Sequence, residues 1–237
     1  LEGIRTKIGE QVEVAYALGT SIRKGIHPLP NDWLTGDGFT FEFFENYTLE
    51  GEPIQTKVSK HSEFEFSTNF LENVPDHTCF AVRITGSFTA PEDGPYKLSF
   101  SGNGQRKIWI NGEQKSDGWT DEEVAMVPWG GPSDQVDLNL ARDEEVQIHI
   151  DFRFKGDMPW RRMEVACLPP EPANPIAEAV ALAQEADKVV LFLGTTAEWE
   201  FEGGDRPNLD LPGEQIKLLD KIIAVNPNTI VVLTTAA

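Results

Sequence analysis

The stretch that decides the fold is Val189-Val-Leu-Phe-Leu-Gly194, in which five apolar residues are followed by a glycine. A continuous apolar run of this length is typical of a parallel strand that is covered on both faces. It lies between two segments with apolar residues at helical spacing, Ile176–Ala186 and Glu214–Ala224, and a second apolar run starts at Thr229. The order strand, loop, helix and strand predicts a βαβ unit of an α/β domain.

Residues 27–168 carry a different pattern, which is typical of an all-β domain. Phe39–Phe44 alternates apolar and polar residues, Phe80–Thr89 is long enough for a full strand, and Asn111-Gly112 is a strong hairpin signal. Further runs with strand character are Phe64–Phe66, Tyr96–Phe100, Lys107–Ile110, Val136–Leu140 and Val146–Phe152. Many short strands separated by turns predict a β-sandwich or a barrel-like domain.

The two ends of the sequence share one pattern. Residues 1–26 read as a short helix followed by a strand at Val12–Ala17, and residues 176–237 supply helix, strand, helix and strand. A Pro-rich linker, 169–175, joins the β region to the second part. The simplest architecture is an α/β domain that is interrupted by a β insertion at 27–168. Two separate domains in series is the alternative.

The composition excludes several classes of function. The chain has 20 Lys and Arg against 39 Asp and Glu, a net charge of −19, so it has no basic surface for nucleic acid and would be repelled by an anionic membrane surface. No run of about 18 apolar residues is present, and no membrane-spanning segment is therefore predicted. A hydrophobic share of 40% with 14 Phe and 6 Trp predicts a folded, globular chain.

The cysteines and histidines predict no metal site. Cys79 and Cys167 each lie in an apolar run, which favours buried free thiols over a disulfide. The four histidines are scattered, and none stands at ligand spacing from a cysteine.

The ends of the sequence point to a longer polypeptide. The last apolar run, Thr229–Ala237, reads as a buried strand, and a folded protein rarely ends by exposing such an edge. We therefore expect an internal segment of a larger protein. No leader peptide is recognisable before the first helix, so the sequence makes no prediction about localisation, secreted or cytoplasmic.

The loop that follows Gly194 concentrates acidic and aromatic side chains. Glu198, Glu200 and Glu202 alternate with aromatic residues. In an extended segment, glutamates at this spacing project to one side, where crowding and aromatic neighbours raise the pKa of a carboxyl group and favour a general acid. A solvated surface loop is the alternative interpretation. The glycine spacing does not match a nucleotide-binding or phosphate-binding fingerprint.

Distinctive motifs follow within and beyond this loop. Glu202-Gly-Gly-Asp-Arg206 is followed by Leu209-Asp-Leu-Pro-Gly-Glu-Gln215, and Asn226-Pro-Asn-Thr-Ile-Val-Val-Leu233 comes after the next helix. Together with Ala186–Gly194, these motifs resemble the second, α/β-sandwich domain of family 3 glycoside hydrolases. Leu1–Gly19 resembles the part of the same domain that precedes a known insertion.

The middle of the chain resembles a PA14 domain. The resemblance is carried by Gly86-Ser-Phe-Thr-Ala-Pro-Glu-Asp-Gly-Pro-Tyr-Lys-Leu-Ser-Phe100 and Ile108-Trp-Ile-Asn-Gly112. A PA14 module inside a family 3 sandwich domain is the arrangement of many β-glucosidases. The two resemblances cover nearly the whole chain and imply an α/β sandwich domain, begun at 1–26 and resumed at 176–237, with a PA14-like β-sandwich between.

The resemblance implies a retaining, exo-acting β-glucosidase that acts on terminal β-D-glucosyl residues of short oligosaccharides or aryl glucosides. In the family, a barrel domain supplies an Asp nucleophile and a loop of the sandwich domain supplies a Glu acid/base. The barrel is absent here, so the remainder of the parent polypeptide is an expected partner and the chain alone is expected to be inactive. No cofactor is implied, and a homo-oligomer is consistent with the resemblance. A non-catalytic carbohydrate-binding or adhesion protein is the alternative.

The resemblance ranks the three glutamates of the loop. Glu202 matches the glutamate of the Glu-Gly-x-Asp-Arg element and is predicted to be the acid/base. Glu200, which fits the loop length of other family members, comes second, and Glu198 comes third. Ion pairing or hydrogen bonding within the loop is expected for the other two.

Aromatic and cationic residues are the candidates for contact with the sugar. Trp199 and Arg206 belong to the acidic loop, where Arg206 is expected chiefly to brace the backbone. Trp119 and Trp129 lie in polar, Gly-rich stretches of the β region, which favours loops near a ligand, with a position in the core as the alternative. Trp109 lies between two isoleucines and is expected to face away from both, in the core or at an edge.

Overall fold

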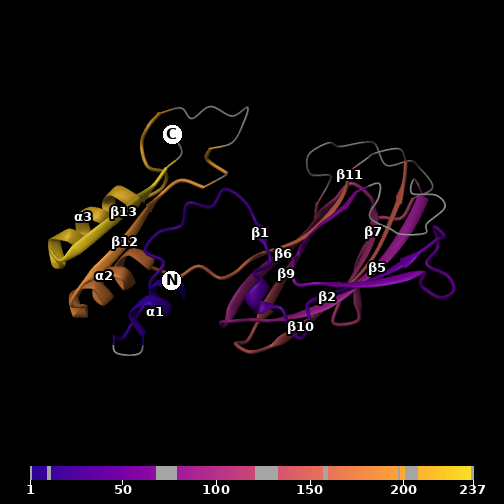
Figure 1. Cartoon of the computed structure of the whole chain (residues 1–237), viewed down its shortest axis with the longest axis horizontal. Coiled ribbons are helices and arrows are strands. Elements are labelled where there is room, and N and C mark those ends of the chain that lie inside the picture. Colours follow the sequence, from indigo (N-terminus) through magenta and orange to yellow (C-terminus); the bar gives the residue numbers. More distant parts are fainter. Residues whose placement is uncertain are drawn as a thin grey trace. The chain divides into compact units, whose positions relative to one another are not determined.

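The computed structural model describes residues 2–9, 12–67, 79–120, 133–156, 160–196, 198–200 and 208–235. The chain divides into two units (Figure 1). The α/β unit is formed by residues 1–25 together with 171–237, and the β unit is formed by residues 26–170. The chain therefore leaves the α/β unit, builds the β unit and then returns. Within the described ranges, no helix is long and apolar enough to span a membrane.

Two antiparallel sheets build the described part of the β unit. The first sheet has the strand order β1 (His27–Pro28), β11 (Trp160–Leu168), β6 (Gly94–Gly102) and β9 (Ser133–Leu140), and β4 (Glu63–Ser67) also pairs with β11. The second has the order β3 (Gln55–Ser59), β2 (Phe39–Phe44), β5 (Cys79–Thr89), β10 (Glu145–Lys155), β7 (Gln105–Ile110) and β8 (Glu113–Asp117). A short 3-10 helix, Asn31–Trp33, follows β1. Because His27 of β1 pairs with Cys167 of β11, the two ends of the unit lie side by side.

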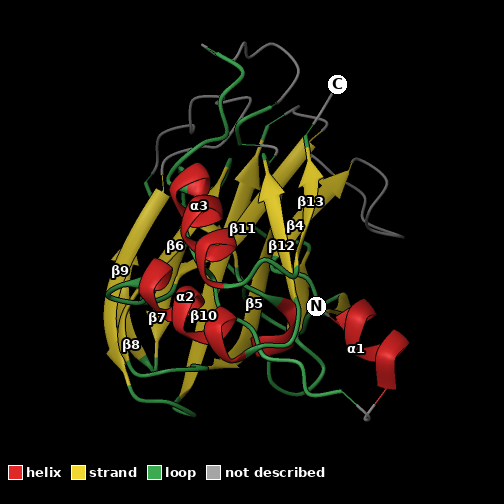
Figure 2. Cartoon of the chain, turned by 90° about the vertical axis from the view of Figure 1, so that its left-hand side faces the viewer, coloured by secondary structure: helices red, strands yellow, loops and turns green. Residues whose placement is uncertain are grey.

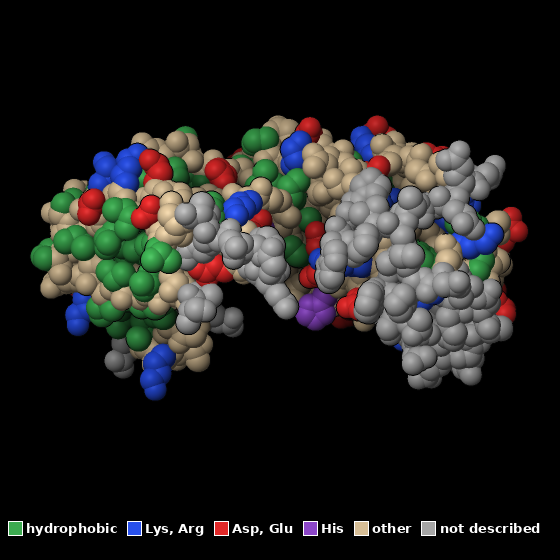
Figure 3. Space-filling model, turned by 90° about the horizontal axis from the view of Figure 1, so that it is seen from above, with side chains coloured by type: hydrophobic (Ala, Val, Ile, Leu, Met, Phe, Trp, Pro, Cys, Tyr) green, Lys and Arg blue, Asp and Glu red, His purple; other side chains and the backbone are tan. Residues whose placement is uncertain are grey.

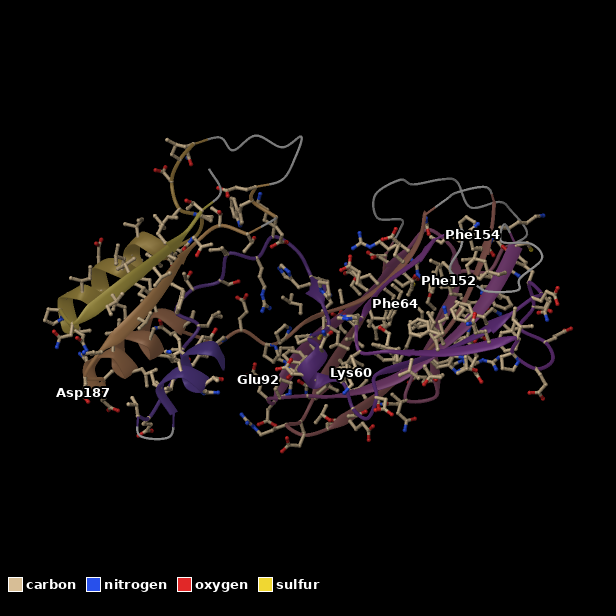
Figure 4. All side chains as sticks on the ribbon, in the orientation of Figure 1. Lys60, Phe64, Glu92, Phe152, Phe154 and Asp187 are labelled. Carbon is tan, nitrogen blue, oxygen red and sulfur yellow. The ribbon has the colours of Figure 1, made fainter. Side chains whose placement is uncertain are left out.

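The hydrophobic core of the β unit lies between the two sheets. Along β10, every second residue is buried, and the residues between them are partly or fully exposed. The buried ones are Val146, Ile148, Ile150, Phe152 and Phe154. Aromatic pairs join the sheets: the rings of Phe41 and Phe64 meet edge to face with centroids 4.5 Å apart. Figure 4 shows Phe64, Phe152 and Phe154 among the strands of this unit.

In the β unit, the strands with apolar alternation form where the sequence predicts them, whereas the two edge strands of the second sheet were not predicted. β3 and β8 are the outermost strands of the second sheet. Their sequences, Gln-Thr-Lys-Val-Ser and Glu-Gln-Lys-Ser-Asp, are mostly polar, because an edge strand carries exposed side chains and needs no apolar periodicity. The predicted hairpin at Asn111-Gly112 is confirmed, since both residues have positive φ (51° and 78°), as a type I′ turn requires.

The α/β unit contains a parallel pair of strands with two helices on one face. Its elements are α1 (Glu2–Ile8), α2 (Pro175–Glu185), β12 (Val189–Gly194), α3 (Gln215–Val225) and β13 (Thr229–Thr234). β12 and β13 pair in parallel, and the predicted strand–helix–strand order is confirmed. Ile176 and Ala183 of α2 pack with Leu218 and Ile222 of α3 against β12. Figure 2 shows both helices on the same side of β12 and β13.

The second face of this strand pair is exposed in the described part of the chain. Phe192 is 58% exposed and Ile230 57%, and both side chains lie on the side away from the two helices. Figure 3 shows hydrophobic side chains gathered on the surface of the α/β unit. Within the described residues, one face of β12 is covered by the helices and the other is exposed, whereas its apolar composition is typical of a strand that is covered on both faces.

The predicted strand at Val12–Ala17 is also wrong. These residues have no regular secondary structure, and Val12 and Tyr16 are 54% and 64% exposed. A strand forms only where a neighbour accepts its hydrogen bonds, and no described strand of the α/β unit pairs with this segment. The alternation of apolar residues alone was a misleading signal here.

Asn226 fixes the junction between the helices and β13. Its buried side-chain amide donates to the carbonyl oxygens of Ala183 (2.9 Å) and Ala186 (2.7 Å), at the end of α2. Its Oδ1 accepts from the backbone N–H of Asn228 (2.9 Å), just before β13. One side chain thus satisfies three backbone groups where two elements end and one begins.

We predict that Asn226→Ala lowers the free energy of unfolding of the α/β unit by about 1–3 kcal/mol, because buried carbonyl groups lose their donor. Asn228→Ala is the matched control, since its exposed side chain makes only a 3.4 Å contact with the Asp187 carbonyl. Urea denaturation followed by helical circular dichroism measures both variants. Equal stability of the two variants would contradict the role given to Asn226.

Candidate functional site

The loop that carries the acidic residues starts at the carboxyl end of β12, where open α/β sheets commonly bind ligands. Gly194 ends this strand against β13. A Cβ atom at this position would lie 1.9 Å from the carbonyl oxygen of Thr234. Only glycine allows the backbones to come this close, and the Thr195 N–H continues the pairing to the same carbonyl at 3.0 Å. The starting point of the loop is therefore fixed by backbone contact.

Gln215 joins the beginning of the loop to its end. Its Oε1 accepts from the Gly194 N–H (2.7 Å), and its Nε2 donates to the carbonyl oxygens of Gly194 (2.8 Å) and Pro212 (2.9 Å). The residue is only 4% exposed. Moving either end of the loop would leave a buried polar group without a partner, so this amide holds the loop closed.

The first residues of the loop form a turn. The Thr196 carbonyl oxygen accepts from the backbone N–H groups of Trp199 (2.8 Å) and Glu200 (3.0 Å). The chain is therefore not extended here, and Glu198 and Glu200 do not project to one side, because residues two apart in a helical turn face different directions. Because the N–H groups of Trp199 and Glu200 bond to the Thr196 carbonyl oxygen, they are not free to pair with a neighbouring strand.

A segment from the start of the chain anchors this turn. Glu198 Oε2 accepts from the Lys24 backbone N–H at 3.2 Å, and Lys24 Nζ donates to the Glu198 carbonyl oxygen at 2.9 Å. Lys24 Nζ also lies 3.9 Å from the centroid of the Trp199 ring, a cation–π contact. The indole Nε1 of Trp199 donates to the Ile22 carbonyl oxygen at 2.6 Å. We call these contacts among Ile22, Lys24, Glu198 and Trp199 the anchor.

The anchoring segment is itself held against α3. A Cβ atom on Gly19, which has φ +72°, would lie 2.6 Å from Leu218 Cδ2. Leu218 is buried between the helices and the strands. The turn at 196–200 is thus tied, through residues 19–24, to the core of the α/β unit.

Several predicted site residues lie outside the described residues. They are Glu202 and Arg206 in the acidic loop and Trp129 in the β unit. Of the loop residues predicted from the sequence, the structure brings Glu198 and Trp199 together with Lys24, a residue that the sequence did not single out. Lys24 carries no local signal, because its partner Glu198 is 174 positions away in the sequence.

Trp119 belongs to a small cluster on the outer side of the second sheet of the β unit. It packs against Phe44, Leu49 and Ala81. Arg153 lies over its ring, with Cζ 4.3 Å from the centroid, and Lys107 Nζ lies 4.5 Å away. Lys107 also pairs with Asp117 at 3.1 Å, and this hydrogen bond lowers the pKa of the Asp117 carboxyl. The ring of Trp119 is therefore largely engaged by protein groups.

A second aromatic residue of the same sheet borders a hollow of ≈ 470 Å³. Trp109 faces away from its buried neighbours Ile108 and Ile110, as the alternation predicts. Its ring contacts that of His149, with centroids 4.7 Å apart. The sequence signal was the outward position of a tryptophan between two core residues, whereas its neighbour His149 lies on a different strand and was not foreseen.

The described residues hold no group of three or more His, Cys, Asp or Glu side chains suited to a metal ion. Neither cysteine forms a disulfide within the described residues; Cys167 is buried, as predicted, whereas Cys79 is half-buried.

The family match and two curated relatives both point to glycoside hydrolases. Residues 1–237 match the family described as the glycosyl hydrolase family 3 C-terminal domain. A β-glucosidase of Rhizobium radiobacter is 28% identical over 252 residues, which cover 99% of this chain and 29% of that protein. A β-glucosidase of Kluyveromyces marxianus is 26% identical over 254 residues, which cover 98% of this chain and 30% of that protein.

A solved structure shares the fold. The crystal structure of the β-glucosidase from Kluyveromyces marxianus in complex with glucose matches with a TM-score of 0.76 at 26% identity, over 98% of this chain and 28% of that chain. The chain thus spans less than a third of the length of these relatives. Because the family match extends over the whole sequence, this chain belongs to the glycosyl hydrolase family 3 C-terminal domain family.

Proposed function

We propose that the chain is part of a retaining, exo-acting β-glucosidase, to which it contributes the loop with the acid/base glutamate. The observation that carries the proposal is the double fixation of this loop, by Gln215 at its two ends and by the anchor at Glu198 and Trp199. A general acid must be held within hydrogen-bonding reach of the leaving-group oxygen, and fixing the described parts of the loop on either side of residues 201–207 favours this. The relatives named β-glucosidases support the same activity.

The proposed chemistry is a double displacement. An Asp carboxylate from another domain of the complete protein attacks C1 of the glucosyl residue while the loop Glu protonates the departing oxygen. The same Glu then removes a proton from water, which attacks C1 and breaks the ester bond to the Asp. The two carboxyl groups of a retaining enzyme lie roughly 5–5.5 Å apart. The remainder of the parent polypeptide is therefore the required partner.

Among the three glutamates, the anchor supports a structural role for Glu198. Its carboxylate accepts from the Lys24 backbone N–H, and its main chain is held by the same residue. A carboxylate used in this way is poorly placed to donate a proton to a substrate. Glu202 remains our proposed acid/base on the strength of its motif, with Glu200 as the second candidate.

We propose further that residues 27–168 form a PA14-like module that shapes the leaving-group subsite and favours short oligosaccharides or aryl glucosides. The β-sandwich of two antiparallel sheets supports this assignment. Trp129 and Trp119 from this module, and Trp199 and Arg206 from the acidic loop, remain proposed sugar contacts. The contacts of Trp119 with Arg153 and Lys107 favour a supporting role for that residue.

The first prediction from this function concerns Glu202→Gln in the complete protein, with an aryl β-glucoside as substrate. Turnover should fall by about 10²–10⁴-fold, because no base activates water in the second step. Added azide should restore it and yield β-glucosyl azide, since azide attacks C1 of the glycosyl-enzyme without needing a base. Product analysis together with the rate measures both effects.

Two companion variants and the wild type decide between the remaining possibilities. Glu198→Gln should still hydrolyse the substrate when no azide is added, because the Glu198 carboxylate is part of the anchor and not the acid/base. Rescue of Glu200→Gln instead of Glu202→Gln would move the acid/base role to Glu200. No turnover by the wild type would overturn the enzymatic proposal and leave the non-catalytic carbohydrate-binding protein.

Gln215→Ala should release both ends of the loop. We expect kcat to fall about tenfold or more with a smaller change in KM, since misplacement of the acid by about 1 Å is costly to catalysis. The free energy of unfolding should fall by about 1–3 kcal/mol. Gln184→Ala, at an exposed position of α2, is the matched control. Wild-type kcat in folded Gln215→Ala would contradict the role of this amide.

Trp199→Phe separates anchoring from sugar binding. The variant keeps an aromatic ring for Lys24 but loses the hydrogen bond to Ile22. If Trp199 anchors the loop, kcat should fall a few-fold with KM nearly unchanged, and Lys24→Ala should reproduce the effect. A rise in KM alone, absent in Lys24→Ala, would show instead that the ring binds the substrate.

A further inference from the structure

The hollow beside Trp109 lies on the outer face of the second sheet of the β unit. Its volume of ≈ 470 Å³ falls within the range of small-molecule sites, about 300–1,000 Å³. The hollow arises because large and small side chains lie next to each other on the sheet. Trp109 and His149 have large rings, whereas Thr85, Ser87 and Gly112 beside them are small.

Strand register brings these residues together. His149 of β10 lies directly opposite Trp109 of β7 on one side and Thr85 of β5 on the other. The Asn111-Gly112 hairpin forms one border, and a Cβ atom on Gly112 would meet nothing within 4 Å. The exposed side chain of Gln147 forms another border of the hollow. The site is therefore built on rigid, paired strands.

His149 is oriented by a carboxylate behind it. Its Nε2 lies 2.8 Å from Asp151 Oδ1, which also receives Arg83 Nε at 3.2 Å. Burial raises the pKa of the Asp151 carboxyl, but the hydrogen bond and charge of His149, with Arg83, outweigh burial and hold this pKa below its usual value. The contact with Asp151 uses Nε2, so Nδ1 is the ring nitrogen left for a hydrogen bond to a ligand.

The border of the hollow combines an aromatic face with hydrogen-bonding groups. An indole ring, an amide, an imidazole and hydroxyl groups line it, and none of the described residues that line it is Lys, Arg, Asp or Glu. Such a set suits an uncharged ligand that has an apolar face and several hydroxyl groups. We propose that this hollow is a pyranose-binding site, with the C–H face of the sugar ring on Trp109 and its hydroxyl groups on Gln147 and His149.

This site is separate from the proposed acid/base loop in the chain and does not rest on the catalytic role. Its ligand class follows from stacking and hydrogen bonds on one sheet face. Among the described residues that line the hollow there is no pair of carboxyl groups, so we expect a sugar held there to be bound without being cleaved.

The test is ¹⁹F NMR of the complete protein labelled with 5-fluorotryptophan, titrated with thiocellobiose, whose sulfur linkage resists hydrolysis. The signal of Trp109 is assigned by its absence in Trp109→Phe. We expect this signal to shift and saturate, and mannitol, an acyclic polyol without a ring face, to leave it unmoved. Because the readout is the Trp109 signal, it reports this site even if the protein hydrolyses no glucoside.

A variant that keeps the labelled Trp109 tests the hydrogen-bonding part of the proposal. Gln147→Ala, at an exposed position, should raise the Kd for thiocellobiose, read from the titration of the Trp109 signal, about fivefold to tenfold. Val58→Ala, an exposed position on β3 outside the hollow, is the matched control and should leave it unchanged. No saturable shift of Trp109, or an equal shift with mannitol, would overturn the proposal.

Discussion

The buried amide of Gln215 is the interaction on which the candidate site depends. Parallel strands need a crossover, so the carboxyl end of β12 and the start of α3 must be joined by a loop. One side chain at the first position of α3 holds the strand end at Gly194 and the loop end at Pro212. These hydrogen bonds keep the two ends of the long loop next to each other. They also fix the position at which the turn after Gly194 begins.

The anchor adds a constraint that no local sequence provides. Lys24 and Ile22 precede the β unit in the sequence and Glu198 and Trp199 follow it, yet these residues are in contact. The contacts of Glu198 and Trp199 with this segment form only if both parts of the α/β unit are folded together. Each single contact contributes little, but a hydrogen bond to a carboxylate, a cation–π contact and an indole hydrogen bond act on the same turn.

The fold could be predicted largely from periodicity. Strands such as β2 and β10 alternate buried and exposed residues, and β12 is uniformly apolar, so their positions followed from the sequence. The polar edge strands β3 and β8 were missed because pairing, not composition, makes them strands. Val12–Ala17 failed for the opposite reason, since it has the composition of a strand without a partner.

The site was less predictable, because its geometry arises from long-range contacts. The motif placed the acidic residues in the loop after β12, but the alternation of Glu198 and Glu200 suggested an extended segment. The Thr196 carbonyl instead closes a turn, and Lys24 determines where Glu198 points. On the sheet face, the pairing of Trp109 with His149 depends on the register of β7 and β10, which no short motif encodes.

The pairing of β1 with β11 has a consequence for how such a protein can change. Since the first and last strands of the β unit are hydrogen-bonded neighbours, the α/β unit has to bridge only a short gap between residues 25 and 171. When the β unit is folded, the α/β unit therefore loses about as much conformational entropy as it would on closing a short surface loop. An unfolded insertion of the same length would cost more. A module with adjoining ends can therefore be gained, exchanged or deleted in one genetic step while its host keeps its own core, which makes it a natural unit of recombination and of protein engineering.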